Sequence, residues 1–265
     1  MSASDPVSGL LPDDLDRIRR ALNTAGPILS RYAGDGARVD HKAGGDPVTE
    51  ADLAVDAVLR EQLLREGEGW LSEETADDLS RLDHSRVWIV DPLDGTKEFV
   101  QGIPEWCVSV GLTIDGEAVA GGIFNPVSGL HVVGAVGQGC WSAGSPCHVR
   151  DGDSLEGIEV LASRSETKRG EWDDFTDAEF TVTPTGSVAF KFAMVAAGET
   201  DATWTLVPKS EWDVAAGVAL VRAAGGDVVL KNGQPPRFNR ESVLFPGLVA
   251  AGPQRLHTIR TRLGV

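Results

Sequence analysis

Residues 87–96, Val-Trp-Ile-Val-Asp-Pro-Leu-Asp-Gly-Thr, indicate both a fold and a chemistry. The four apolar residues are typical of a short buried β-strand. We expect the strand to end at Asp91, because Pro92 cannot donate a ladder hydrogen bond. The turn then presents the carboxylates of Asp91 and Asp94 and the carbonyl of Leu93 at one strand end. Hard oxygen ligands of this kind suit magnesium, calcium or manganese.

The two residues that follow Asp94 suit an anion. Gly95 and Thr96 begin a segment with helical character, and backbone N–H groups at a helix N-terminus bind phosphate oxygens well. One turn can therefore hold both a cation and the phosphate that it activates. Asp-Gly is also a common turn dipeptide, so the spacing alone leaves a purely structural turn open as the alternative.

The size and charge of the chain narrow the class of protein. Its 265 residues are enough for one large domain or two modest ones. The 24 basic and 40 acidic residues give a formal net charge of −16, which repels nucleic acid polymers and anionic membranes. No apolar run approaches the roughly 18–20 residues that span a bilayer. We expect a small-molecule partner, although an acid-rich surface is also typical of salt-adapted proteins.

The cysteines and the first residues bear on the compartment. Cys107, Cys140 and Cys147 form neither a CxxC pair nor an even disulfide framework, so we expect small buried side chains. The first ten residues lack the basic and apolar regions of a secretory signal. A reducing cytoplasm is the expected location.

Hydrophobic periodicity predicts two halves that share a cleft. Residues 1–150 are predicted to form an α+β half, and residues 151–265 an α/β half, with a boundary in a Gly-, Ser- and Pro-rich loop. The elements predicted for the first half are helices over 12–32 and from 49, a strand over 87–90, an antiparallel meander over 106–114, 118–124 and 131–136, and the boundary loop over 137–154. Those predicted for the second half are strands over 157–162, 179–182, 201–206, 227–230 and 248–251, and helices over 187–197, over 214–224 and from 253.

Other acidic residues could complete a metal site. Glu73 and Glu74 are adjacent, Asp52 follows Thr49 in a T-x-x-D pattern typical of a helix cap, and Asp213 precedes an apolar helix. Each can be a solvated or capping residue instead. Spacing alone does not bring these carboxylates together.

Four ordered motifs resemble the signatures of the inositol monophosphatase superfamily of metal-dependent, lithium-sensitive phosphatases. The motifs are Pro47-Val-Thr-Glu-Ala-Asp52, Ser72-Glu-Glu74, Asp91-Pro-Leu-Asp-Gly-Thr96 and Trp212-Asp-Val-Ala-Ala-Gly217. The resemblance spans residues 40–252. It implies a layered αβαβα sandwich and the hydrolysis of a phosphomonoester by an activated water.

The resemblance also implies the ligands of two to three magnesium ions, with manganese as a substitute. A first ion would be held by Glu73, Asp91 and the Leu93 carbonyl. A second would share Asp91 and add Asp94 and Asp213.

The catalytic roles come from the same resemblance. Asp52 and Thr96 would orient and deprotonate the attacking water, with Glu74 assisting, and the amides of Gly95 and Thr96 would hold the phosphate. Lys42 lies in a loop that could approach the site.

Within the superfamily, the bacterial 3′(2′),5′-bisphosphate nucleotidases resemble this chain most. The shared features include Leu71-Ser-Glu-Glu74, Lys97-Glu98-Phe99 and the segment 208–213. The implied reaction is hydrolysis of the 3′-phosphate of adenosine 3′,5′-bisphosphate to AMP. The implied substrate-binding residues are Gly95, Thr96, Ser163, Arg164, Ser165, Gly186, Ser187, Lys191 and Lys209.

Two departures keep other substrates open. Glu166 stands where the nucleotidases have a histidine, and the segment 101–106 is more similar to inositol monophosphatases and histidinol phosphatases. Leu206 stands where inositol-binding members have a glutamate, which argues against inositol. Inositol monophosphatase, histidinol phosphatase and fructose-1,6-bisphosphatase activities remain alternatives, with a non-catalytic metal-binding protein as a remote one. A homodimer is compatible with the resemblance.

Overall fold

The computed structural model describes residues 9–35, 39–41, 47–175 and 179–264. The first half of the chain contributes a seven-stranded sheet and its neighbouring helices. Its elements are α1 (Asp14–Asp35), β1 (Val39–His41), β2 (Pro47–Thr49), α2 (Glu50–Leu63), β3 (Gly69–Ser72), a 3₁₀ turn (Ser80–Asp83), β4 (Arg86–Asp94), α3 (Thr96–Val100), β5 (Cys107–Ile114), β6 (Glu117–Asn125), β7 (Leu130–Ala135), β8 (Gly139–Ser142) and β9 (Ser145–Pro146).

The second half contributes a five-stranded sheet and further helices. Its elements are β10 (Glu159–Ser163), α4 (Arg164–Lys168), a 3₁₀ turn (Asp173–Phe175), β11 (Thr181–Thr185), α5 (Val188–Ala196), β12 (Ala202–Trp204), β13 (Lys209–Ser210), α6 (Glu211–Ala223), β14 (Asp227–Leu230), β15 (Leu244–Phe245), β16 (Leu248–Ala251) and α7 (Pro253–Leu263).

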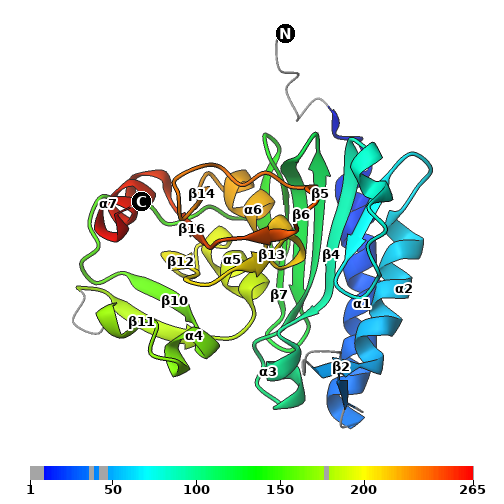
Figure 1. The fold of residues 1–265 in the computed structure, drawn as a ribbon, viewed down its shortest axis with the longest axis horizontal. Coiled ribbons are helices and arrows are strands. Elements are labelled where there is room, and N and C mark those ends of the chain that lie inside the picture. Colours follow the sequence, from blue (N-terminus) through cyan, green and yellow to red (C-terminus); the bar gives the residue numbers. More distant parts are fainter. Residues whose placement is uncertain (1–8, 36–38, 42–46, 176–178, 265) are drawn as a thin grey trace.

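These elements stack in five layers, the predicted αβαβα sandwich (Figure 1). Helices α1 and α2 cover one face of the first sheet, whose strands run in the order β3-β4-β5-β6-β7-β8-β9. Helices α5 and α6 lie between this sheet and the second, ordered β11-β10-β12-β16-β14. Helix α7 packs on the outer face of the second sheet. The first sheet is antiparallel apart from the parallel pair β3–β4.

Regular apolar spacing explains which helix faces are buried. In α1, Ile18, Leu22, Ala25 and Leu29 recur every three or four residues, and all four are fully buried. Between the sheets, one apolar core contains residues of both halves, so the halves are packed against each other rather than joined by a linker.

Helix α6 lies very close to the first sheet because the facing positions are glycines. A Cβ added to Gly121 of β6 would lie 2.7 Å from the carbonyl oxygen of Ala216, and one added to Gly111 of β5 would lie 2.8 Å from the Ala216 amide nitrogen. The missing side chains let the helix backbone rest on the strands. This contact places the N-terminus of α6, which carries Asp213, near the end of β4 and the start of β5.

The predicted end of the strand at Asp91 is wrong. Strand β4 continues to Asp94, and its register against β5 shifts, so that Asp91 faces Ser109 and Asp94 faces Cys107. Two residues of β4 thus lie opposite one residue of β5, which is a bulge. Pro92 is tolerated there because a bulge needs no ladder donor at that residue.

The predicted loop over 137–154 is also partly wrong, because it contains the hairpin of β8 and β9. Ala143 and Gly144 both have positive φ, +47° and +82°, as a two-residue hairpin turn requires. The three cysteines are buried, as expected, and each is a free thiol. Within the described ranges, no helix combines the length and apolar character needed to cross a bilayer.

Candidate active site

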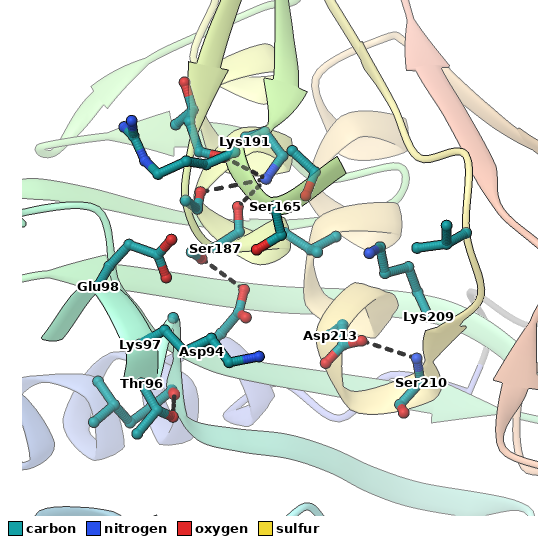
Figure 2. A pocket seen from close by; sticks show the side chains of 18 of the residues that line it. Asp94, Thr96, Lys97, Glu98, Ser165, Ser187, Lys191, Lys209, Ser210 and Asp213 are labelled. Carbon is teal, nitrogen blue, oxygen red and sulfur yellow. Dashed lines mark hydrogen bonds between the residues drawn. The ribbon is translucent and has the colours of Figure 1, made fainter. Parts of the chain in front are cut away.

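A cavity of about 540 Å³ gathers most of the predicted site residues. Its walls come from the end of β4, from α3 and α4, and from the N-termini of α5 and α6 (Figure 2). Four of the predicted metal ligands line it, namely Glu73, Leu93, Asp94 and Asp213. So does every predicted substrate-binding residue, namely Gly95, Thr96, Ser163, Arg164, Ser165, Gly186, Ser187, Lys191 and Lys209. Lys42 lies outside the described residues.

Three carboxylates converge, and two of them, Glu73 and Asp213, line this cavity. Glu73, Asp91 and Asp213 each offer an oxygen within 4.8 Å of the other two. Asp91 is 1% exposed; its Oδ1 accepts a hydrogen bond from the Leu93 amide at 3.0 Å. Its Oδ2 is buried and has no hydrogen-bond partner among the described residues. A buried oxygen without a partner is costly when it carries charge, so this atom is suited to binding a cation.

The raised pKa values of Asp91 and Asp213 reflect their burial and the closeness of the other carboxylates. Burial raises the pKa of Asp91 well above its usual range, and the charges of Glu73, Asp94, Asp213 and Asp52 raise it further. Burial likewise raises the pKa of Asp213 to about 8, with Asp94 and Glu73 adding to the effect. Like charges held this closely are unfavourable without a bound cation.

The capping of α6 orients Asp213. Its Oδ2 accepts a hydrogen bond from the Ser210 amide at 2.8 Å, as part of a capping box at the start of the helix. Asp213 is therefore both a cap and a member of the acidic cluster, the two alternatives that the sequence left open.

Asp94 is held from the opposite wall of the cavity. Its Oδ2 accepts hydrogen bonds from the Ser187 hydroxyl and from the Ala189 amide, both at 2.6 Å. It is not one of the three residues with mutually close oxygens, but its charge contributes to the raised pKa values of Asp91 and Asp213.

The turn after Asp94 fixes Thr96 beside the predicted carbonyl ligand. Gly95 has a φ of +95°, and a Cβ there would lie 2.8 Å from the Glu105 carbonyl oxygen, so only glycine fits. The Thr96 hydroxyl donates to the Leu93 carbonyl at 3.1 Å. Asp52 is buried in the first turn of α2, close enough for its charge to affect Asp91.

Asp56 is a site residue that the sequence analysis missed. One of its carboxylate oxygens accepts from the Ser72 hydroxyl and the other from Thr75 Oγ1, and the Glu74 amide donates to Ser72 Oγ. Asp56 thus ties α2 to the segment that carries Glu73 and Glu74. It lies four residues after Asp52, and this helical spacing could have predicted that both face the same neighbour.

The predicted substrate-binding cations all have partners. Arg164 contacts both oxygens of Glu105, at 2.7 and 2.6 Å, and Glu105 also accepts from the Gly186 amide at 2.6 Å. Lys209 pairs with Glu166 at 3.1 Å. Lys191 is 1% exposed and donates to three backbone carbonyls; burial lowers its pKa to about 8.

Glu166 does not face the cavity. It is fully buried, and its Oε2 accepts from the Trp172 indole at 3.1 Å and from the Leu206 amide at 3.0 Å. Its role in the cavity is therefore indirect, through Lys209. Glu105 was also missed, because nothing in its local sequence relates it to residues 59 and 81 positions away.

The donor set fits a hard divalent cation. All the converging ligands are oxygens, and one of them is buried without a hydrogen-bond partner among the described residues. The neighbouring N–H groups and cations suit a phosphorylated molecule, so the arrangement is suited to phosphoryl transfer to water.

Comparisons with known proteins agree with this chemistry. The sequence model of the inositol monophosphatase family matches residues 13–262. An inositol monophosphatase from Mesembryanthemum crystallinum is 31% identical, covering 88% of this chain and 90% of its own. The 3′(2′),5′-bisphosphate nucleotidase CysQ of Escherichia coli K12 is 33% identical, covering 88% and 97%. The structure of an inositol monophosphatase from Anabaena superposes with a TM-score of 0.78 at 30% identity, covering 94% of each chain.

Proposed function

Because this chain belongs to the inositol monophosphatase family of metal-dependent phosphatases, we propose that it is a magnesium-dependent, lithium-sensitive phosphomonoesterase that hydrolyses the 3′-phosphate of adenosine 3′,5′-bisphosphate to AMP. The family fixes the class of reaction. The substrate and the metal are the proposal, and relatives named for both inositol phosphate and bisphosphate nucleotides are similarly close in sequence.

The concentration of cations around the cavity carries the choice of a bisphosphate. The chain has 24 basic residues and a net charge of −16, yet five basic side chains line this one cavity: Lys97, Arg164, Arg169, Lys209 and Lys191, the last of which directs its N–H donors at backbone carbonyls. An ammonium has three N–H donors and a guanidinium five, so Lys209 and Arg164 keep donors beyond those that their carboxylate partners take. A second phosphate can use these donors in charge-assisted hydrogen bonds.

The position of Leu206 also favours a nucleotide over inositol. By the resemblance described above, inositol-binding members carry a glutamate at this position. Here the leucine does not line the active-site cavity but a second one, about 220 Å³ in volume, beside Trp204. No carboxylate at this position is available for inositol hydroxyls.

The proposed roles of the residues come from the family resemblance. Glu73, Asp91 and the Leu93 carbonyl would hold one magnesium, and Asp91, Asp94 and Asp213 another. Magnesium bound there would neutralise charge on the phosphoryl oxygens and lower the pKa of an attacking water.

The remaining residues act on the water and the phosphate. Thr96 and Asp52 orient that water and accept its proton, with Glu74 in support. The amides of Gly95 and Thr96 hold the phosphate.

Phosphate release from a panel of substrates tests the proposal. We expect kcat/KM for adenosine 3′,5′-bisphosphate to exceed that for inositol 1-phosphate, histidinol phosphate and fructose 1,6-bisphosphate by at least about tenfold. Activity should require magnesium and fall with lithium, and full turnover in excess EDTA would refute the metal assignment. A preference for inositol 1-phosphate would instead support the second candidate, an inositol monophosphatase, which the names of several relatives favour.

A further inference from the structure

We propose that Lys191 and Ser187 are positioning residues for Asp94, which together aim one oxygen of that carboxylate at the cation site, rather than substrate contacts. The inference rests on the proposed function in one respect: Asp94 is taken as a metal ligand. In Figure 2, Lys191, Ser187 and Asp94 follow one another along the cavity wall.

The surroundings of Lys191 leave it no donor for a substrate. Its Nζ donates to the carbonyl oxygens of Ser187 at 2.6 Å, Thr185 at 3.2 Å and Gly186 at 3.3 Å. An ammonium has three N–H groups, so all three are used. The side chain is 1% exposed, and a phosphate could reach it only after these bonds were broken. Burying a lysine costs free energy unless its hydrogen bonds are satisfied, and these three carbonyls satisfy those of Lys191.

The three carbonyls lie where β11 ends and α5 begins, and this 185–187 turn is unusually constrained. Ser187 has a φ of +50°, a conformation that non-glycine residues rarely adopt and that costs free energy. The turn is also fixed from outside, because Glu105 accepts from the Gly186 amide at 2.6 Å. Such strain persists only where the surroundings impose it, and Lys191 and Glu105 are those surroundings.

The strained conformation serves Asp94. It directs the Ser187 hydroxyl to Asp94 Oδ2 at 2.6 Å, while the same oxygen atom of Ser187 accepts from the Phe190 amide at 2.9 Å as the cap of α5. The Ala189 amide donates to Asp94 Oδ2 as well, at 2.6 Å. The two hydrogen bonds to Oδ2 disfavour rotation of the carboxylate and so direct Oδ1 to a cation.

Cation affinity in the absence of substrate tests the inference. Binding of Mn²⁺ to the purified protein is measured by electron paramagnetic resonance for wild type, Lys191→Met and Ser187→Gly. Partners that orient metal ligands contribute about 10- to 100-fold to metal affinity, so we expect losses of that size in both variants. Arg169→Met is the matched control: Arg169 lines the same cavity and pairs with Glu171, away from the 185–187 turn.

The direction of the change in Mn²⁺ affinity distinguishes a positioning role of Lys191 from a purely electrostatic effect of its charge. Removing a nearby positive charge would by itself tighten Mn²⁺ binding, as expected to a small extent for the control. Weaker binding in Lys191→Met therefore supports positioning, whereas unchanged or tighter binding overturns it. Because no substrate is present, an error in the substrate assignment cannot produce either result.

Ser187→Gly guards against a variant that simply misfolds. Glycine accepts a φ of +50° without strain and is a tolerable helix cap. We expect the thermal midpoint of the metal-free variant to equal or exceed that of wild type while its Mn²⁺ affinity falls. Equal Mn²⁺ affinity in this stable variant would refute the role of Ser187.

Discussion

The buried ion pair between Glu166 and Lys209 offers a test of how the cavity wall is held. Glu166 is fully buried, and Lys209 approaches it at 3.1 Å with its side chain 13% exposed. In Glu166→Gln, the amide oxygen can still accept from Trp172 and from the Leu206 amide, but the amide N–H₂ then faces the ammonium. Breaking a buried pair costs about 3–5 kcal/mol, and because Lys209 can turn into the cavity we expect about 3 kcal/mol.

For a domain of this size, such a loss lowers the thermal midpoint by about 6–12 °C. Differential scanning calorimetry of the variants measures it. The double variant Glu166→Gln/Lys209→Met removes the stranded charge, so it should recover at least half of the loss. A free energy of unfolding for Glu166→Gln within about 1 kcal/mol of wild type would refute the reasoning. So would a double variant whose loss of stability equals the sum of the losses in Glu166→Gln and Lys209→Met.

Four further predictions concern the catalytic centre. Asp213→Asn should lower kcat at least about 1000-fold at saturating magnesium; steady-state turnover above a tenth of wild type would contradict its assignment. Asp52→Asn should lower kcat with KM little changed, and a raised KM at constant kcat would make it a binding residue. Asp56→Ala should weaken Mn²⁺ binding about 10- to 100-fold, because it releases the segment that carries Glu73. An unchanged Mn²⁺ titration would show that this segment keeps its position without Asp56. Burial raises the pKa of Asp213 to about 8 from 3.8, so the folded metal-free protein keeps a proton there that the unfolded chain loses, and the stability that this carboxyl contributes is lost between about pH 4 and pH 8. Over that range the thermal midpoint in EDTA should therefore change less favourably with rising pH in wild type than in Asp213→Asn, and parallel curves would contradict the raised pKa.

The sequence predicts the centre of the site better than its walls. The converging carboxylates lie in motifs whose local signals are strong, such as the apolar run before Asp91 and the apolar helix after Asp213. The layered fold follows from the same motifs through family resemblance. The bulge at Pro92 was missed because periodicity records where side chains point, not whether a ladder bond can be skipped.

The supporting residues could not be predicted because their partners are distant in sequence. Asp56 reaches Ser72 and Thr75, and Glu105 reaches both Arg164 and Gly186. Each looks like an ordinary surface acid until the chain is folded. Lys191 does line the cavity that contains the other predicted substrate contacts. Composition, however, cannot show whether a lysine contacts a ligand or a backbone carbonyl.

The close packing of α6 on Gly111 and Gly121 has a consequence for how such a protein can diversify. The helix that carries Asp213 rests directly on Gly111 and Gly121, so the position of its backbone depends on two absent side chains, while the Ser210 amide orients the carboxylate. On the proposed assignment, the segments around 163–169 and 205–209 could be exchanged to accommodate another substrate without altering Gly111 or Gly121. A methyl group at Gly111 or Gly121 would instead push α6 away from the sheet and displace Asp213. On that assignment, the metal ligand on α6 depends on the packing of the scaffold, whereas the proposed substrate contacts lie on segments that can be replaced.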